Sequence, residues 1–498
     1  MKRELNRRNF LKLSSVATVY ALSNRLLNAA DNIDDDYKAI VVIYKGGGND
    51  SLNMFIPSSS DPKTGYSNYA NIRNNIKVTD KSLDLLVDGN NELDLSAGNP
   101  YAMNNSLVDG YTKGFYRHVD DNGNDLGVAT NALMPELAHL INQKQVAIIQ
   151  NCGNIIQKAT KTQLQNKTKP TPPFLYAHNH QTKLAFNGEA EFLDYTGWAG
   201  RLYDRWKDVN DGDIYDMNIS VGGVTHLFEG NITKPLSINP SGPSKYRNQN
   251  KVLYENYLKL SRRDIFKKVY NDIRVHSFSM QDTIVDDWQN NSPDFSSLTN
   301  AYGEKLFSKP SNETLSQSSP VFASTSLLRQ LEAVAKLAKI GKDRASVKRE
   351  IFYVFDGGYD THNNQSQQHA RKLRGVSMAL GDFYKAIESM GMQNNITTIT
   401  VSDFARSTGN NGDGSDHAWG GSYFVMGGAV KGGIYGIAPD LTLGSDDDMT
   451  KKGRLIPTTS FTQYYATVVK WFGADETTLN DVFPELENFA QKDLGFMK

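Results

Sequence analysis

A run of β-branched residues that ends in a carboxylate constrains the fold of this chain most. Residues 396–401 are Ile-Thr-Thr-Ile-Thr-Val, and Asp403 follows shortly after them. Such a run is typical of a strand that is buried on both faces, as in a parallel sheet covered by helices. Ligands of open α/β sheets bind outside the carboxyl ends of the strands, so we expect Asp403 at a functional edge.

Two further strand-like runs end in the same way. Residues 39–44 (AIVVIY) lead into a glycine-rich turn that ends at Asp50. Residues 351–355 (IFYVF) lead into a turn that contains Asp360 and His362. Because parallel strands place their carboxyl ends at one edge of a sheet, these side chains are expected to lie together.

The residue types at these strand ends predict a metal site. Carboxylate oxygens and imidazole nitrogens suit zinc, manganese and similar divalent ions. Two such ions ~4 Å apart can polarise an ester and stabilise its entering and leaving oxygens. We predict one or two ions, zinc or manganese, with these ligands: Asp50, Asp360, His362, Asp403 and His417. The alternative for Asp50 and Asp403 is that they cap helices, which aspartate often does.

The rest of the chain alternates between strand and helix patterns. This alternation predicts an α/β fold with a mostly parallel, doubly wound sheet. We expect further strands at 145–150, 219–221 and 236–238, helices at 131–142, 365–390 and 460–472, and a hairpin from 422–426 and 433–435. Residues 58–130 are expected to form a long loop with short strands, and residues 245–345 a mostly helical insertion.

The N-terminus has the pattern of an export signal. Arg7 and Arg8 are followed by Phe-Leu-Lys and by the apolar run 13–22, which resembles a twin-arginine signal peptide. The apolar run is shorter than the ~20 residues that span a bilayer. We therefore expect a signal peptide at 1–30 and one domain at 31–498. The twin-arginine translocon would export it folded, to the periplasm or the medium, with no integral membrane segment in the mature form.

Composition excludes several classes of protein. The formal net charge is −1, so no overall positive field favours nucleic acid as a partner. The chain has one cysteine, Cys152, which excludes a disulfide framework and a thiolate zinc site within one chain.

Seven short motifs carry a resemblance to a known family. They occupy residues 42–50, 172–181, 197–201, 357–362, 402–406, 416–421 and 453–457. In these motifs the chain resembles the exported bacterial family catalogued as domain of unknown function 1501, a branch of the alkaline phosphatase-like superfamily. The resemblance implies a phosphatase/sulfatase-like sheet of alkaline phosphatase-like type, and a divalent-metal site built from the five residues named above.

The chain departs from this family where a nucleophile is expected. Ala177 stands where family members often have serine, and Phe404 stands where phosphatases of the superfamily usually have histidine. Ser51 is then the nearest hydroxyl to the predicted metals. The other catalytic candidates are Arg406, with Lys45, for anion stabilisation, and the histidines of the H-x-H pair: His178 and His180.

Two functions follow from these residues. The first is an exported metal-dependent hydrolase of phosphate or sulfate esters, acting on a small-molecule or glycan ester. The alternative is a non-catalytic cell-envelope binding protein that retains the hydrolase fold, which Ala177 and Phe404 favour. The sequence leaves the choice between them open.

Overall fold

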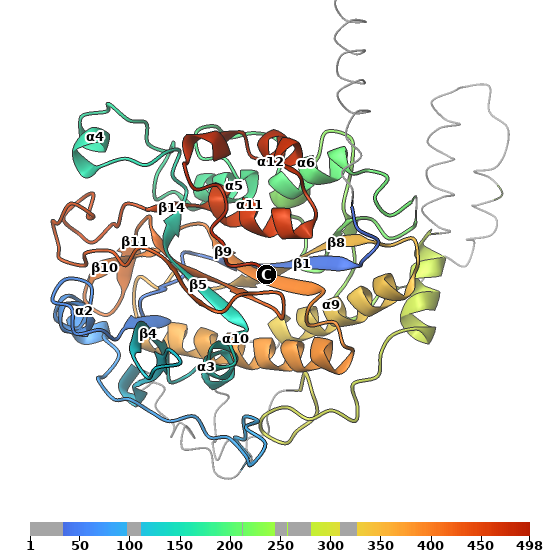
Figure 1. Cartoon of the computed structure of the whole chain (residues 1–498), viewed down its shortest axis with the longest axis horizontal. Helices are drawn as coiled ribbons and strands as arrows, with labels where there is room; N and C mark the ends of the chain where they lie inside the picture. The colour runs from blue at the N-terminus through green and yellow to red at the C-terminus, as the bar shows by residue number, and fades with distance from the viewer. Residues whose placement is uncertain (1–32, 97–110, 212, 245–255, 257–279, 309–325) are drawn as a thin grey trace, which may run out of the picture.

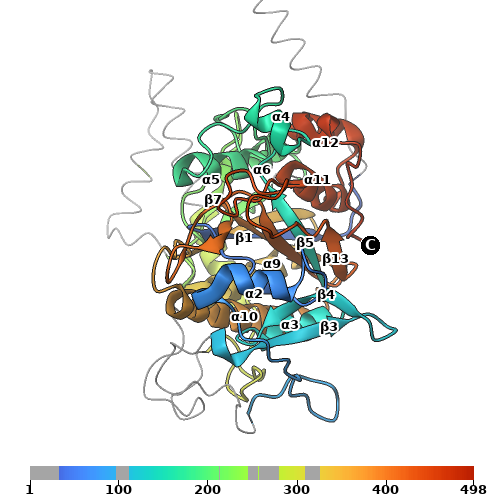
Figure 2. The ribbon, with the colours of Figure 1, turned by 90° about the vertical axis from the view of Figure 1, so that its left-hand side faces the viewer.

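A central sheet lies between two layers of helices (Figures 1 and 2). The computed structural model describes residues 33–96, 111–211, 213–244, 256, 280–308 and 326–498. In this part of the chain the main sheet has nine strands, in the order β13-β5-β12-β9-β1-β8-β6-β7, with β14 beside β5. Their bounds are β1 (Lys38–Gly46), β5 (Val146–Gly153), β6 (Asn218–Ser220), β7 (Leu236–Ser237), β8 (Arg349–Gly357), β9 (Ile396–Ser402), β12 (Gly421–Met426), β13 (Gly433–Gly436) and β14 (Thr459–Ser460).

The sheet is mostly parallel, as the sequence predicted. β1 pairs in parallel with both β8 and β9, and β8 continues in parallel to β6. β12 runs antiparallel to its neighbours β9 and β5. The carboxyl ends of β1, β8 and β9 therefore meet at one edge of the sheet, which is where the candidate site lies.

The hairpin predicted from residues 422–426 and 433–435 is wrong. Both segments form strands, but β5 lies between them and pairs with each. β5 is buried along almost its whole length, so both of its edges require a hydrogen-bonding partner. The chain meets this requirement by placing β12 and β13 on opposite edges of β5.

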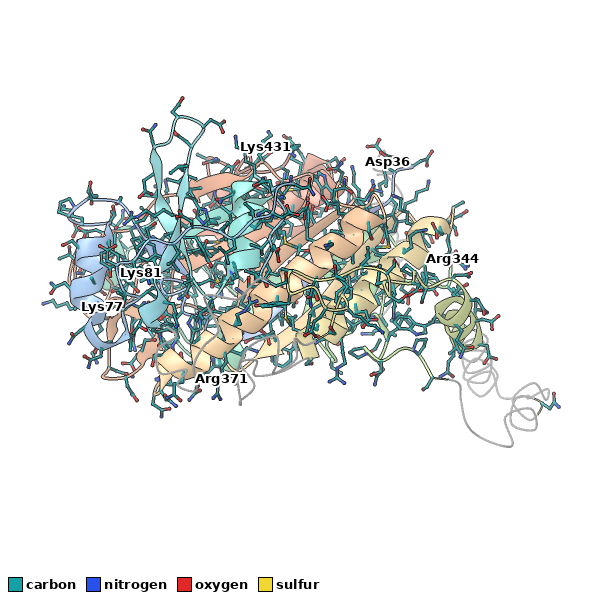
Figure 3. The ribbon with its side chains drawn as sticks, turned by 90° about the horizontal axis from the view of Figure 1, so that it is seen from below. Asp36, Lys77, Lys81, Arg344, Arg371 and Lys431 are labelled. Carbon is teal, nitrogen blue, oxygen red and sulfur yellow. The ribbon has the colours of Figure 1, made fainter. Side chains whose placement is uncertain are left out.

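The two helical layers follow from the alternation of side chains along β1. Ala39, Val41 and Ile43 pack with α3, α9 and α10, whereas Ile40 and Val42 pack with α5, α6, α11 and α12. The helices are α3 (Pro135–Asn142), α5 (His178–Asn187), α6 (Trp198–Arg205), α9 (Ser326–Asp343), α10 (Gln365–Ser389), α11 (Phe461–Phe472) and α12 (Glu476–Val482). Figure 3 shows α10 running across the lower face, with exposed Arg371 directed away from the sheet. The predicted helices in 131–142, 365–390 and 460–472 are confirmed.

The segment predicted as a long loop holds more structure than expected. A small sheet in the order β2-β4-β3 forms from β2 (Phe55–Pro57), β4 (Asp125–Asn131) and β3 (Phe115–Val119). The helix α2 (Tyr66–Arg73) lies between β2 and β3 in the sequence and buries Tyr69 and Arg73. Its Asn- and Ser-containing sequence has little amphipathic pattern, so tertiary packing rather than local preference determines this helix.

The remaining short elements complete the description. They are η1 (Asn74–Ile76), α4 (Lys161–Gln165), η3 (His226–Phe228), β10 (Arg406–Asn410), β11 (Ser415–His417) and η4 (Pro484–Asn488). Of the predicted helical insertion, residues 280–290 are helical and α9 packs on the sheet, while the rest falls largely outside the described residues. The predicted signal peptide also lies outside them. Among the described helices, none has the length and apolarity needed to cross a membrane.

Candidate metal centre

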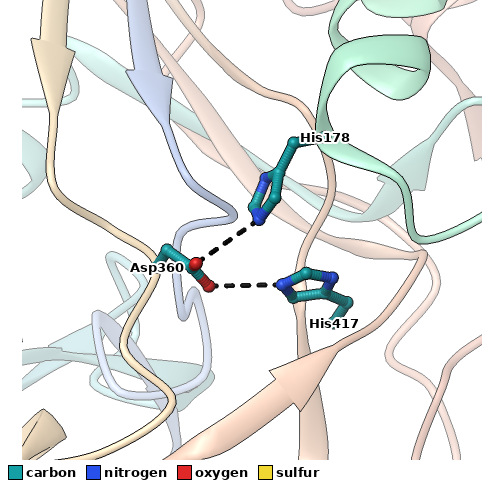
Figure 4. A group of neighbouring side chains, drawn as sticks. All are labelled: His178, Asp360 and His417. Atoms are coloured by element: carbon teal, nitrogen blue, oxygen red, sulfur yellow. Dashed lines mark hydrogen bonds and ion pairs between the residues drawn. The ribbon is translucent and has the colours of Figure 1, made fainter.

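Three elements bring a carboxylate and two imidazoles together at the carboxyl edge of the sheet. His178 is the first residue of α5, Asp360 lies in the turn after β8, and His417 ends β11. Ligand atoms of these three residues all lie within 4.8 Å of one another (Figure 4). Each comes from a different part of the chain, and the parallel sheet gathers them.

A third imidazole, that of His362, borders this group. Its Nε2 lies 2.9 Å from His417 Nε2 and 3.1 Å from Asp360 Oδ1. His417 Nε2 is 3.2 Å from Asp360 Oδ1, and His178 Nε2 is 3.5 Å from Asp360 Oδ2. Ligands at ~2.0–2.1 Å from a tetrahedral zinc ion are about 3.3–3.4 Å apart. The donor spacing therefore suits one ion.

The Nδ1 atom of each histidine faces a partner outside the group. His178 Nδ1 contacts the Asp403 carboxylate, His417 Nδ1 donates to Tyr176 O at 2.8 Å, and His362 Nδ1 lies 3.4 Å from Asp416 Oδ1. Histidines that bind metals commonly engage their other nitrogen in this way, which fixes the tautomer and the ring. His178 Nε2 is buried and makes no hydrogen bond within the described residues. The residues present therefore fit a divalent cation.

Charge within the cluster is already partly balanced by Arg406. Its Nη1 donates to Asp360 Oδ1 at 2.7 Å. Burial acts to raise the pKa of Asp360, but the hydrogen bond and charge of Arg406 outweigh it and lower this pKa. The hydrogen bond to Asp403 raises the pKa of His178, whereas burial lowers the pKa of His417.

Asp403, predicted as a ligand, lies behind His178 instead. One of its oxygens contacts His178 Nδ1, and the other accepts from Gly47 N at 3.2 Å and from Ser402 Oγ at 3.0 Å. The side chain is 1% exposed. This arrangement makes Asp403 the residue that orients His178, and it leaves His178 as the group that faces the site.

Asp50 has partners of a different kind. Its carboxylate accepts from Arg73 Nη1 at 2.6 Å and Nη2 at 3.0 Å, and also from Gln365 Nε2. Burial acts to raise the pKa of Asp50, but the charge of Arg73 outweighs it and the pKa is lowered. The charge of the Asp50 carboxylate is therefore balanced by the Arg73 guanidinium. Asp50 does not belong to the histidine group.

The other catalytic candidates are dispersed. Ser51 is buried, and its Oγ accepts from Ser422 N at 2.8 Å. His180 stacks on the exposed ring of Phe174, with 4.2 Å between ring centroids. Lys45 is buried 4.9 Å from the Phe424 ring, and burial lowers its pKa to about 7. Of the five catalytic candidates, the structure brings only His178 and Arg406 to Asp360.

Three residues that contact the histidines or Asp50 could not be recognised from the sequence. Asp416 directly precedes His417, and Tyr176 lies within the motif 172–181, but no spacing marks either as the partner of a histidine. Arg73 was missed because it lies on α2, in a segment that showed no helical pattern. Asp416 contacts His362 rather than its neighbour His417, so the sequence spacing gave no signal for this pair.

Comparison with known proteins gives one family. Residues 337–476 match the family described as "Protein of unknown function (DUF1501)". The resemblance drawn from the motifs is thereby confirmed for this segment, which contains Asp360, His362, Asp403 and His417. No curated protein matches the chain.

Among the solved structures that match this chain, three show only a faint similarity to it. The crystal structure of Ps i-CgsB has 11% identity and a TM-score of 0.30, covering 71% of each chain. Its complex with k-i-k-neocarrahexaose has 10% identity and a TM-score of 0.31, covering 91% of this chain and 77% of that one. The integral membrane protein lipooligosaccharide phosphoethanolamine transferase A (EptA) from Neisseria meningitidis has 10% identity and a TM-score of 0.32, covering 99% and 65%. At these scores the likenesses carry no argument about function.

Proposed function

We propose that this chain is a metal-dependent hydrolase of phosphate or sulfate esters, of the alkaline phosphatase-like type, acting on a small-molecule or glycan ester. The observation that carries the proposal is the convergence of His178, His417 and Asp360, bordered by His362, at the carboxyl edge of the sheet. A donor set rich in imidazole suits zinc better than manganese. We therefore propose that the site binds one zinc ion.

The residues of the chain supply the surroundings that such a reaction needs. When bound, a divalent cation supplies a Lewis acid that polarises the ester oxygen. Asp403 and Tyr176 O hold His178 and His417 in place, and Arg406 provides a positive charge beside the reacting anion. Ser51 contacts the backbone of Ser422, and Ala177 has no hydroxyl. We therefore propose water as the nucleophile.

Turnover of p-nitrophenyl phosphate and p-nitrophenyl sulfate tests this function. Protein purified with zinc should hydrolyse one of the two esters, and EDTA should abolish the rate. Asp360→Asn should bind zinc poorly and lose the activity, while the exposed variant Arg371→Gln serves as the matched control. Metal analysis by mass spectrometry must show zinc in the active protein.

A second candidate function follows from the lack of a serine hydroxyl at the cluster. Because Ala177 and the buried Ser51 leave the cluster without an evident serine nucleophile, a cell-envelope protein that binds its ligand without turnover is the alternative. Zinc binding with no hydrolysis of either ester would favour this alternative. Absence of any bound metal would contradict the metal-dependent hydrolase and leave the binding protein as the remaining candidate.

Export is part of the proposal. We propose that the twin-arginine translocon carries the folded chain to the periplasm or the medium, on the basis of Arg7 and Arg8 with the apolar run after them. Replacing both arginines by lysine should retain the protein in the cytoplasm. Unchanged delivery, measured by cell fractionation, would contradict the export proposal and leave the metal site untouched.

A further inference from the structure

Arg406 has one end that is fixed and one that faces the candidate metal centre. Its side chain is 0% exposed. Nη2 donates to Ser415 O, and Nε lies 3.4 Å from Ser415 Oγ, so two of its nitrogens are held by one residue. The remaining contact, from Nη1, goes to Asp360 Oδ1 at 2.7 Å.

The fixed end is anchored by a buried chain of hydrogen bonds that ends at Asp50. Ser415 Oγ donates to Gln365 Oε1 at 2.6 Å, and Gln365 Nε2 donates to Asp50. Arg73 in turn binds Asp50 through two nitrogens. All of these residues are buried, so the network is rigid compared with an exposed ion pair. It holds the guanidinium at a set place beside the histidines.

The other end contacts an exposed carboxylate that borders the histidines. Arg406 Nη1 donates to Asp360 Oδ1 at 2.7 Å, and His362 Nε2 and His417 Nε2 lie within 3.2 Å of the same oxygen. The Asp360 side chain is 45% exposed and is free to adjust, whereas Arg406 is held. A cation bound by Asp360 would offset the carboxylate charge and repel the guanidinium, so it would weaken the pairing with Arg406 Nη1.

We propose that Arg406 is an exchangeable counter-ion: it pairs with Asp360 when the site lacks a cation, and pairs with the anionic group of the ligand when a cation is present. The inference rests on the proposed function, since it takes phosphate or sulfate as that group. A guanidinium beside a cation is repelled until an anion lies between them. Cation and anion then favour each other's binding by the same factor, as linkage requires.

Measured affinities for zinc test this coupling without any turnover. Zinc titrations of the full chain, by calorimetry with a competing chelator, are made with and without inorganic phosphate or inorganic sulfate. The variants are Arg406→Gln, which removes the charge, and Arg406→Lys, which keeps it. Arg371→Gln is the control, because it also removes a positive charge, and Arg371 is exposed on α10 and makes none of the Asp360 contacts.

The expected results separate a charge effect from a packing effect. Without anion, Arg406→Gln should bind zinc more tightly than wild type, on the order of tenfold, because a positive charge has been removed. Arg406→Lys should bind zinc about as wild type does. Phosphate or sulfate should tighten zinc binding by roughly tenfold in wild type and much less in Arg406→Gln. Circular dichroism confirms that each variant is folded.

Other results would overturn the inference. Weaker zinc binding in both Arg406 variants would show that the arginine only supports the fold of the site. Equal anion coupling in wild type and Arg406→Gln would show that the anion interacts with the cation alone. Coupling without hydrolysis of any ester would uphold the inference and count against the hydrolase, so the two proposals fail separately.

Discussion

Asp50 and Asp360 both follow strands that end at the same edge of the sheet, yet their surroundings differ. Asp50 is 1% exposed and paired with Arg73, which is 0% exposed. Asp360 is 45% exposed and is surrounded by His178, His362 and His417 in addition to one contact from Arg406. A carboxylate that already has a buried guanidinium has its charge balanced within the chain. A carboxylate among imidazoles, with one contact from an arginine, is the one that has room for a cation.

A third carboxylate, Glu350, shows another way of balancing charge. It lies near the amino end of β8, away from the site edge, and is fully buried. It accepts a hydrogen bond from Tyr37, while its Oε1 has no hydrogen-bond partner among the described residues. Burial raises the pKa of Glu350 to about 8. Thus the negative charge of Glu350 is neutralised by a proton and that of Asp50 by an arginine. We propose that a metal balances the charge of Asp360.

The largest effect on stability is expected at Asp50, whose charge is balanced by Arg73. Asp50→Ala leaves Arg73 buried without its partner, and breaking a buried pair costs about 3–5 kcal/mol. The free energy of unfolding, measured in urea, should fall by this amount with EDTA present as well as without it. The double variant Asp50→Leu with Arg73→Met should recover most of the loss, because an apolar pair needs no counter-charge. A loss seen only when zinc is present would instead place Asp50 at the metal.

The next effect concerns Glu350 and depends on pH. The folded state holds the proton of Glu350 up to a pKa of about 8, whereas the ordinary value is 4.5. The stability given by the protonated form is therefore complete below pH 4.5 and is lost as the pH rises through 8. Each unit of difference corresponds to ~1.4 kcal/mol, so the change is a few kcal/mol.

Glu350→Gln isolates this dependence. Glutamine keeps an acceptor for Tyr37 and has no proton to lose, so the variant should gain stability relative to wild type between pH 4.5 and 8. Urea unfolding at several pH values measures the difference between the two proteins. If that difference is the same at every pH, Glu350 is not the group that titrates.

Zinc binding is expected to change the free energy of unfolding by an amount similar to, or smaller than, the effect of Glu350. At a zinc concentration of 100 times its Kd, wild type should gain about 2.7 kcal/mol in free energy of unfolding. Asp360→Asn should lose this gain, and Asp403→Asn should reduce it by loosening His178. Thermal melts with EDTA or zinc measure both. A wild type purified without metal and insensitive to EDTA would contradict the metal site.

These comparisons show what could be predicted from the sequence. The strands before Asp50, Asp360 and Asp403 are continuous β-branched or aromatic runs, so their burial and shared edge could be inferred. The partner of Asp50 could not be inferred from the sequence, because Arg73 lies on α2, whose apolar residues show no clear helical spacing. The placement of β5 between β12 and β13 could not be predicted from the sequence either, because strand pairing depends on the whole sheet rather than on adjacent segments.

The site was predicted in part for the same reason. Asp360 and His417 lie on segments that the sheet edge brings together, and both are in the group. The contact between His178 and Asp403 could not be predicted from the sequence, because either type of side chain binds metals. In the structure His178 Nδ1 contacts Asp403, and His178 Nε2 faces Asp360.

The smallest effect is expected at Ala177, which precedes His178 and is the N-cap of α5. This cap has no side-chain hydrogen bond. Ala177→Ser adds an acceptor for a backbone N–H of the first turn, and such caps stabilise a protein by about 1 kcal/mol. The variant should therefore melt slightly higher than wild type, with EDTA as well as with zinc.

The same substitution also tests the choice between hydrolase and binding protein. It places a hydroxyl beside the histidine group. If water is the nucleophile in wild type, the rate of p-nitrophenyl ester hydrolysis should change little in Ala177→Ser, since the chain already carries what it needs. Hydrolysis that appears only in Ala177→Ser would show that the cluster lacks a nucleophile in the natural chain, and that this protein binds its ligand without turnover. Ala177→Gly, which leaves the cap without a hydroxyl, is the control for changes in the helix alone.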